Sequence, residues 1–210
     1  MADRLTIDLR VGLRELYPQG LYSDLLIYSG DSHYEVHKII LHAQSSVFGS
    51  MFEGELHLES TGQHSIRLDE DDPIALGVLI DFLYTSLYNE KRAALAGDAL
   101  LFAVDLYAMA VKYKVDALCF VAANRLTQSL TVTMANLQAC IRVIRKIDAC
   151  SADDDDGLWN ALARKLTPQL RWLGTNSDFW ALQRELKPLM TAMSRAGSMS
   201  WSGGEGGAGK

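Results

Sequence analysis

The sequence predicts an α+β domain followed by an all-α extension, and three observations support this fold class. The apolar run Asp24–Tyr28 and the alternating run His33–His37 are separated by a short glycine-containing turn, which is the pattern of a β-hairpin. Acidic residues directly before Pro73 are typical of a helix N-terminus, because they favour the positive end of the helix dipole. From Leu130 onward, apolar residues recur at helical spacing.

The first 20 residues are predicted to form a short helix. Four leucines recur at helical spacing along one face of it, namely Leu5, Leu9, Leu13 and Leu16. The segment Tyr17–Gly20 contains proline and glycine and therefore ends the helix. An apolar stripe of this kind needs a covering surface, either in the same chain or in a partner.

Two short helices and a third strand are predicted to follow the hairpin. The helices are expected at Lys38–Gln44 and over residues 45–52, where a serine can serve as the N-cap of the second one. Glu53–Gln63 is a polar, glycine-containing loop, and Ser65–Leu68 alternates as a strand. These elements belong to a domain that we place at residues 21–130.

Three longer helices are predicted to complete this domain. Asp72 is expected to cap the first helix, which begins at Pro73, and Asp98 is expected to cap the second. The third helix is expected to begin at Val115. Between the first two helices, Tyr84–Gly97 is predicted to be a loop, or a weak strand followed by a short helical piece.

The extension over residues 131–197 is predicted to be helical throughout. It carries three stripes of leucine, isoleucine and methionine at helical spacing. Pro168 and Pro188 lie inside the last two stripes and should kink or split those helices. The glycine- and serine-rich residues 198–210 are predicted to form a disordered tail.

The overall charge argues against a nucleic-acid partner. The net charge is −6 and the isoelectric point is near 5.3, so the chain lacks the basic field that binds phosphates. The densest basic group, Arg142, Arg145 and Lys146, is typical of a solvated helix face.

Cysteine usage and hydropathy predict a soluble protein in the cytoplasm or the nucleus. The three cysteines show no Cys-x-x-Cys spacing, and buried reduced thiols indicate a reducing compartment. The first residues lack an apolar signal core. No stretch reaches the ~20 apolar residues that a membrane span needs, and no membrane partner is expected.

Three stretches of the chain resemble the BTB/POZ family, and they occur in the family's order. They are Ser23–Ile27; Tyr34–Leu41 with Val47-Phe48 and Met51-Phe52; and Leu79–Thr85 with Ala108–Tyr113. The resemblance covers about Leu21 to Leu130 and implies the BTB/POZ fold, in which a short hairpin and strands pack with helices. The segment Tyr84–Gly97 is longer than the family pattern, which argues against the strand that is usual at this place.

The resemblance implies a homodimer in which the helix before the hairpin packs against its copy. Leu9, Leu13 and Leu16 are therefore the expected interface residues, with packing inside one chain as the alternative. Asp24 is expected beside this contact in a small charged pocket, and the alternative is an exposed turn residue. His37 is expected to have a structural role under the junction between strand and helix.

A second implied partner is a cullin, the scaffold of one class of ubiquitin ligase. Adaptors of this family commonly carry a hydrophobic-x-Glu motif after the Met-Phe pair, but here the glutamate of Leu58-Glu59-Ser60 is displaced by one position. We therefore expect cullin binding to be weak or absent. If a cullin binds, the residues expected at the contact by family position are Phe52, Leu56, Leu58, Glu59 and Tyr84.

No catalytic, metal or cofactor site is predicted. The five histidines show no His-x-x-x-His spacing, and no cysteine lies near them in sequence. The acidic run Asp153–Asp156 lacks the closing glutamate of a calcium loop and is interpreted as a loop before a helix. The chain contains neither Gly-x-Ser-x-Gly nor a complete phosphate-binding loop.

The sequence therefore predicts a non-enzymatic interaction module that acts as a homodimerising scaffold or adaptor, with a protein partner that the sequence does not name. The alternative is a substrate adaptor of a cullin-type ubiquitin ligase. The 210 residues hold no kelch repeat or zinc finger, which favours the scaffold. An enzyme with an unrecognised site is the third and least favoured class.

Overall fold

The computed structural model describes residues 12, 14–15, 17–53, 57–58, 63–150, 157–169, 173, 176–179 and 187–201. The chain divides into two compact units. The first comprises Met1–Asp98 and Met109–Cys119, and the second comprises Ala99–Ala108 and Phe120–Lys210. The predicted interface leucines, Leu9, Leu13 and Leu16, lie outside the described residues.

The first unit contains a four-stranded sheet in the order β2-β1-β4-β3. Strands β1 (Leu25–Ser29) and β2 (Ser32–Val36) form the predicted antiparallel hairpin, with Ile27 opposite Tyr34. β4 (His64–Arg67) runs parallel to β1 and pairs antiparallel with β3 (His57–Leu58). The two-residue strand β3 lies in the segment that we predicted to be a loop. Two residues are too few to show an alternating pattern, so this strand could not be predicted from periodicity.

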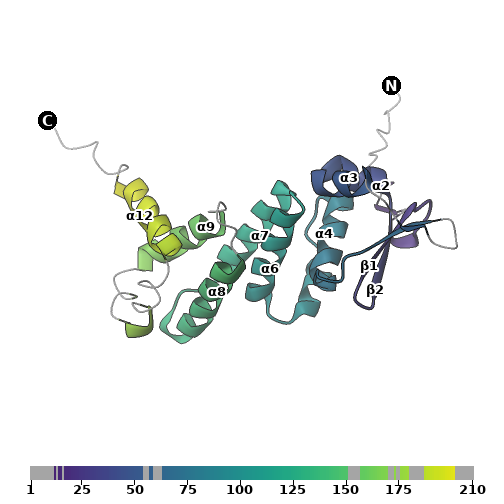
Figure 1. Cartoon of the computed structure of the whole chain (residues 1–210). Coiled ribbons are helices and arrows are strands. Elements are labelled where there is room, and N and C mark those ends of the chain that lie inside the picture. Colours follow the sequence, from purple (N-terminus) through teal and green to yellow (C-terminus); the bar gives the residue numbers. More distant parts are fainter. Residues whose placement is uncertain are drawn as a thin grey trace, which may run out of the picture. The chain divides into compact units, whose positions relative to one another are not determined.

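Three helices pack with this sheet (Figure 1). α2 (Lys38–Gln44) and α3 (Ser46–Glu53) lie next to each other, and α4 (Pro73–Thr85) runs alongside β1 and β2. Asp72 caps α4 as predicted, because its Oδ1 accepts a hydrogen bond of 2.8 Å from the amide of Ala75. Every residue of α4 from Ala75 to Tyr84 is buried, so this helix forms the centre of the core of the first unit.

The segment after α4 contains helix instead of a strand. α5 (Glu90–Ala93) begins at the N-cap Asn89, whose side chain accepts a hydrogen bond from the amide of Arg92, and a 3₁₀ turn follows at Ala94–Ala96. The short helical piece predicted for this segment is confirmed. Tyr84–Gly97 is described throughout and contains no strand.

The second unit is helical, as predicted. α6 (Ala99–Lys112) begins in this unit and ends in the first, and it is followed by α7 (Asp116–Ser129), α8 (Leu137–Cys150), α9 (Gly157–Leu166) and α12 (Lys187–Trp201). Pro168 lies in a 3₁₀ turn directly after α9, and Pro188 lies in the first turn of α12. α12 extends to Trp201, beyond the point at which we expected the tail to begin.

Most apolar residues of these stripes are buried where they are described, whereas Met190 of α12 is 41% exposed. In α8 the buried side chains include Leu137, Ile141 and Ile144, and in α9 they include Leu158 and Leu162. Among the described residues no single helix has both the length and the apolar character of a membrane span. The segment Glu90–Ala96 and α6 meet such criteria only as a pair bent by 109°.

Candidate interaction surface

His37 connects three segments of the first unit. It lies between β2 and α2, and its Nε2 is 2.8 Å from the carbonyl oxygen of Leu21. Because a carbonyl oxygen can only accept, Nε2 carries a proton, and in the neutral ring Nδ1 is free to accept. Nδ1 lies 2.8 Å from the hydroxyl of Tyr84, and that hydroxyl also accepts a bond of 2.7 Å from the His37 amide. His37 therefore ties the segment before β1 to the end of α4.

Tyr84 is covered in this structure. Its side chain is 3% exposed, and the ring of Tyr17 stacks on it with a centroid distance of 4.3 Å and an interplanar angle of 12°. Burial raises the pKa of the Tyr84 phenol, and the charge of Asp24 raises it further. A direct contact between Tyr84 and a cullin therefore requires Tyr17 to move away from it.

Asp24 is exposed in the single chain, and the small charged pocket expected for it beside a dimer contact stays a prediction. The reason for its exposure is its position, because β1 begins one residue later and Asp24 faces the start of α2 instead of the core. Its Oδ1 accepts a hydrogen bond of 2.8 Å from the amide of Lys38, the first residue of α2. Since His37 provides no side-chain cap, Asp24 takes the place of one.

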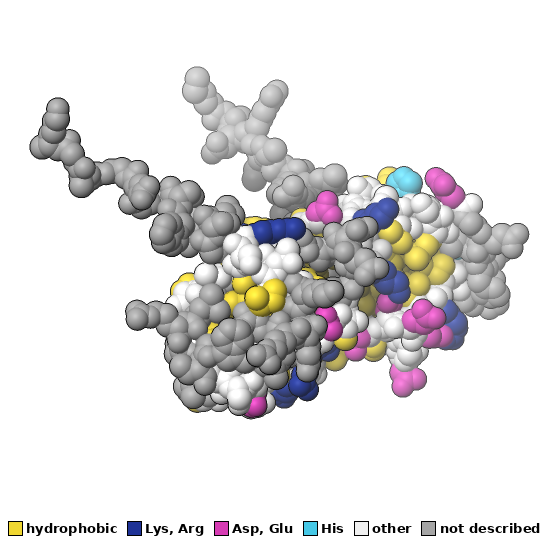
Figure 2. Space-filling model, turned by 60° about the vertical axis from the view of Figure 1, so that its left-hand side comes forward, with side chains coloured by type: hydrophobic (Ala, Val, Ile, Leu, Met, Phe, Trp, Pro, Cys, Tyr) yellow, Lys and Arg dark blue, Asp and Glu magenta, His cyan; other side chains and the backbone are white. Residues whose placement is uncertain are grey.

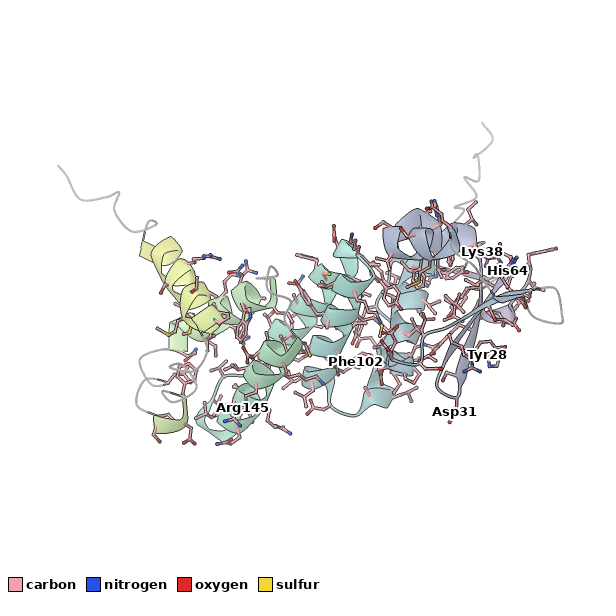
Figure 3. The ribbon with its side chains drawn as sticks, viewed as in Figure 1. Tyr28, Asp31, Lys38, His64, Phe102 and Arg145 are labelled. Carbon is pink, nitrogen blue, oxygen red and sulfur yellow. The ribbon has the colours of Figure 1, made fainter. Side chains whose placement is uncertain are left out.

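Exposed apolar side chains flank this junction. Tyr22 is 86% exposed, Ile39 is 73% exposed and Leu21 is 44% exposed. Large apolar groups that face water on neighbouring segments are typical of a surface that associates with another protein. We call Leu21, Tyr22, Asp24, Lys38 and Ile39 the junction surface. In Figure 3 the labelled Lys38 lies at one end of the sheet. The labelled Tyr28 and Asp31 lie toward the opposite end, where the hairpin turns.

Charges of both signs are mixed over the protein. On the face shown in Figure 2, acidic and basic side chains alternate with apolar ones instead of forming a single basic field. This agrees with the net charge of −6 and gives no support to a phosphate-binding face on the side that the picture displays.

A buried carboxylate near the surface was missed by the sequence reasoning. Asp81, in the middle of α4, is 7% exposed, and its Oδ2 accepts hydrogen bonds from Arg92 Nε at 2.8 Å and Asn89 Nδ2 at 2.6 Å. The Arg92 guanidinium lies over the Tyr34 ring, 5.8 Å from its centroid. We call Asp81, Asn89 and Arg92 the outer cluster. An acidic residue inside the apolar run Leu79–Leu83 was the available signal for it.

Glycine makes room for the outer cluster. A Cβ atom at Gly77 of α4 would lie 2.7 Å from one guanidinium nitrogen of Arg92 and 3.0 Å from the Tyr34 hydroxyl. Any larger residue at this position would therefore displace Arg92 from the face of α4. The cluster holds α5 against α4, and Leu87 and Leu95, which precede and follow α5 in the sequence, are exposed.

A polar groove lies beside the outer cluster. It has a volume of about 970 Å³ and is lined by Pro18–Gly20, by Asp31–Glu35 of the hairpin and by Leu87–Arg92. Its charged side chains are of both signs, so the groove shows no preference for a ligand of one charge. Among the described residues, no group of three or more histidine, cysteine, aspartate or glutamate side chains is arranged to hold a metal ion.

A second buried carboxylate of the first unit is that of Asp71. Asp71 is 9% exposed, its Oδ1 accepts from Lys112 Nζ at 2.6 Å, and its Oδ2 accepts from the Tyr113 hydroxyl at 2.5 Å. The Ser29 hydroxyl donates to the Asp71 carbonyl oxygen at 2.7 Å, which connects β1 to the same point. We call Asp71, Lys112 and Tyr113 the inner cluster. Burial raises the pKa of the Tyr113 phenol, and Asp71 adds to the effect.

The residues expected at a cullin contact are only partly described. Leu56 and Glu59 lie outside the described residues, and for Leu58 only the backbone of β3 is described. Phe52 is half-buried and stacks on Phe48 at a centroid distance of 6.0 Å. The structure therefore brings Phe52 and Tyr84 into the same unit without testing the remaining three residues.

Comparison with known proteins gives one consistent family. A family model for the BTB/POZ domain matches residues 13–129. BTB and MATH domain-containing protein 42 of Caenorhabditis elegans is 25% identical over 196 residues, which cover 89% of this chain and 42% of that protein. TD and POZ domain-containing protein 4 of Mus musculus is 30% identical over 132 residues, or 63% of this chain and 33% of that protein.

Human Kelch-like protein 2 is 36% identical over 74 residues, which cover 35% of this chain and 12% of that protein. Among solved structures, the BTB domain of zebrafish PATZ1 has a TM-score of 0.46 at 19% identity and covers 61% of this chain and 97% of that one. The chain spans less than half the length of each of these three relatives. With the family model matching more than half of its residues, the chain belongs to the BTB/POZ family, whose domain is a protein-interaction module.

Proposed function

We propose that this protein is a homodimerising scaffold that presents bound partners in pairs. The observation that carries this proposal is the junction surface, where Tyr22 and Ile39 are largely exposed beside the Asp24 carboxylate. Burial of these side chains against a second copy would remove apolar area from water, which favours association. The leucines predicted before the junction, Leu9, Leu13 and Leu16, would extend the same contact.

A homodimer explains why apolar and charged groups lie together here. An exposed carboxylate that already accepts one backbone hydrogen bond keeps further acceptor positions for a partner's donor. The two-fold symmetry of a homodimer places each copy's junction surface against the same region of the other copy. A dimer would also raise the apparent affinity for any partner that is itself repeated, because the second contact becomes intramolecular.

Sedimentation over a wide concentration range tests this proposal. At a chain concentration of roughly tens of micromolar, the parent should sediment near twice its 23.2 kDa mass. It should dissociate on dilution. Leu13→Asp and Ile39→Asp should each weaken the dimer, because an unpaired charge at an apolar contact is costly. Leu95→Asp is the matched control, since Leu95 is 72% exposed, as Ile39 is at 73%, and is not part of the junction surface. A monomer at every concentration would contradict the proposal.

A cullin-ligase adaptor is the second candidate, favoured by the family membership and by the half-buried Phe52. Two features weigh against it, namely the displaced glutamate and the covered Tyr84 ring. Misplacing one anchor residue in a small interface can cost ~2 kcal/mol or more. Titration of a purified cullin N-terminal domain into the protein tests this. A dissociation constant below about 1 μM, near −8.2 kcal/mol, would make the ligase adaptor the leading function.

A further inference from the structure

The segment Tyr17–Leu21 is attached to the first unit at three points. The Tyr17 ring stacks on Tyr84, and the Leu21 carbonyl oxygen lies 2.8 Å from His37 Nε2. Between them, the backbone of Gly20 lies against the Glu35 side chain so closely that a Cβ atom would be 1.6 Å from Glu35 Oε2. We call these three attachments the clasp.

Gly20 is required for the middle attachment. Its φ of +61° lies in the left-handed region that favours glycine, and the space beside it is already filled by Glu35. The amide of Gly20 donates to the Tyr17 carbonyl oxygen at 3.1 Å, which closes a tight turn. This turn brings Tyr17 back over α4 while Leu21 continues toward β1.

The outer cluster lies directly under the first attachment. Burial raises the pKa of the Tyr17 phenol, and the nearby charge of Asp81, which is itself held by Arg92 and Asn89, raises it further. Tyr17 therefore rests on α4 by stacking on Tyr84, with the Asp81 carboxylate close by. Both Tyr84 and Asp81 are less than one tenth exposed, so Tyr17 lies against buried side chains.

We infer that Tyr17 is a positioning residue that fixes where the N-terminal segment leaves the domain and thereby sets the geometry of self-association. The inference rests on the proposed function, because the leucines expected at the dimer contact directly precede Tyr17 in the chain. A segment that is free to move would lose conformational entropy on association, whereas a seated one has already lost it. Tyr17 thus favours the dimer without having to touch the second copy.

Two variants separate the aromatic stack from the phenolic hydroxyl. Tyr17→Ala removes both and should weaken self-association about tenfold, which corresponds to 1.4 kcal/mol. Tyr17→Phe keeps the stack and should remain within about threefold of the parent, since aromatic stacking is the larger contribution expected here. Phe120→Ala is the control, because Phe120 is an aromatic side chain that is 70% exposed in the second unit. Sedimentation is carried out well below the melting temperature of each variant.

Limited trypsin digestion gives a readout that does not depend on the dimer. Arg14 is exposed and lies three residues before Tyr17, so cleavage there reports release of the segment. Digestion at a concentration where the protein is monomeric should cleave Tyr17→Ala at Arg14 about tenfold faster than the parent or Phe120→Ala. The factor of ten is the same order as one lost aromatic stack.

The outcomes are distinguishable. Faster cleavage together with weaker self-association supports the inference. An unchanged cleavage rate shows that Tyr17 does not fix the segment, and faster cleavage with unchanged self-association shows that fixing it does not position the dimer. Either result overturns the inference and leaves the proposed homodimer intact. A parent chain that is monomeric at all concentrations overturns the proposed function and the positioning role together.

Discussion

The inner and outer clusters use the same kind of residue in two different ways. Asp71 and Asp81 are both buried carboxylates of the first unit, and each pairs with one cation. Asp71 uses one oxygen for Lys112 and the other for Tyr113. Asp81 instead directs one oxygen to both Arg92 and Asn89. The inner cluster therefore needs both oxygens as acceptors, whereas the two donors of the outer cluster need only one.

The surroundings of the two clusters also differ. Tyr113 is fully buried, stacks on Phe48 at a centroid distance of 4.6 Å, and has its backbone carbonyl bound by the Ser45 hydroxyl at 2.6 Å. The outer cluster borders the polar groove and supports surface residues on α5 and on the clasp. We conclude that the inner cluster serves the stability of the domain, and that the outer cluster orders surface segments.

The largest effect expected from this comparison is that of Asp71→Asn. An asparagine at this position can accept only through its single oxygen, so either Lys112 or the Tyr113 hydroxyl loses its acceptor. Because Tyr113 is fully buried, its hydroxyl cannot turn to water, and a buried unsatisfied donor costs about 1–3 kcal/mol. We expect a loss of about 2–3 kcal/mol in the free energy of unfolding, measured by urea denaturation. The Lys112 side chain is about half exposed, so water screens its ion pair with Asp71. Loss of that ion pair is therefore the smaller part of the expected destabilisation.

Asp81→Asn is the matched comparison. Its single side-chain oxygen can still accept from Arg92 and Asn89, so the variant loses charge but keeps both hydrogen bonds. We expect a smaller loss of about 1 kcal/mol in the free energy of unfolding, measured in the same urea titration. Equal destabilisation by the two substitutions would show that the number of oxygens in use does not distinguish the clusters.

Alkaline titration gives a second comparison, of intermediate size. Burial raises the folded-state pKa of Tyr113 above the ordinary value of 10.0, and Asp71 raises it further. Above pH 10 the unfolded chain releases this proton while the folded chain keeps it, so stability is complete below pH 10 and falls as the pH rises. Tyr113→Phe should remove up to about 1.4 kcal/mol of this fall between pH 10 and pH 11. The measurement is urea denaturation at each pH, and parallel curves for variant and parent would contradict it.

The sequence predicted the parts of the fold that depend on local signals. The hairpin, α2 and the Asp72 cap follow from alternation, helical periodicity and a side chain that reaches three residues along the chain. The clusters depend on long-range contacts, since Asp71 meets residues 41 and 42 positions later and Asp81 meets Arg92 11 positions later. No periodicity connects such residues, so neither pairing could be derived before the fold was known.

The candidate site also shows that long-range contacts could not be predicted from the sequence. The resemblance drew attention to His37, Asp24 and Tyr84; His37 and Tyr84 contact each other, and Asp24 accepts from the amide of Lys38, the residue after His37. Their exposure was not predictable in the same way. Tyr84 is covered by Tyr17, which the sequence presented only as part of a turn, and Asp24 faces the start of a helix one residue before its strand begins.

The effect that we predict for Asp24, the exposed carboxylate that resembles neither cluster, is no larger than that of Asp81→Asn. Asp24→Ala removes the acceptor for the amide of Lys38, and loss of an N-cap typically costs ~1 kcal/mol. Measured by urea denaturation at a concentration where the chain is monomeric, the variant should be less stable by about that amount. Asp31→Ala, an exposed position in the hairpin turn, is the control and should stay within about 0.5 kcal/mol of the parent. If Asp24→Ala is as stable as this control, its carboxylate does not cap α2. If it instead costs as much as Asp71→Asn, an exposed capping acid is worth as much as a buried one, and the contrast between surface and core carboxylates fails.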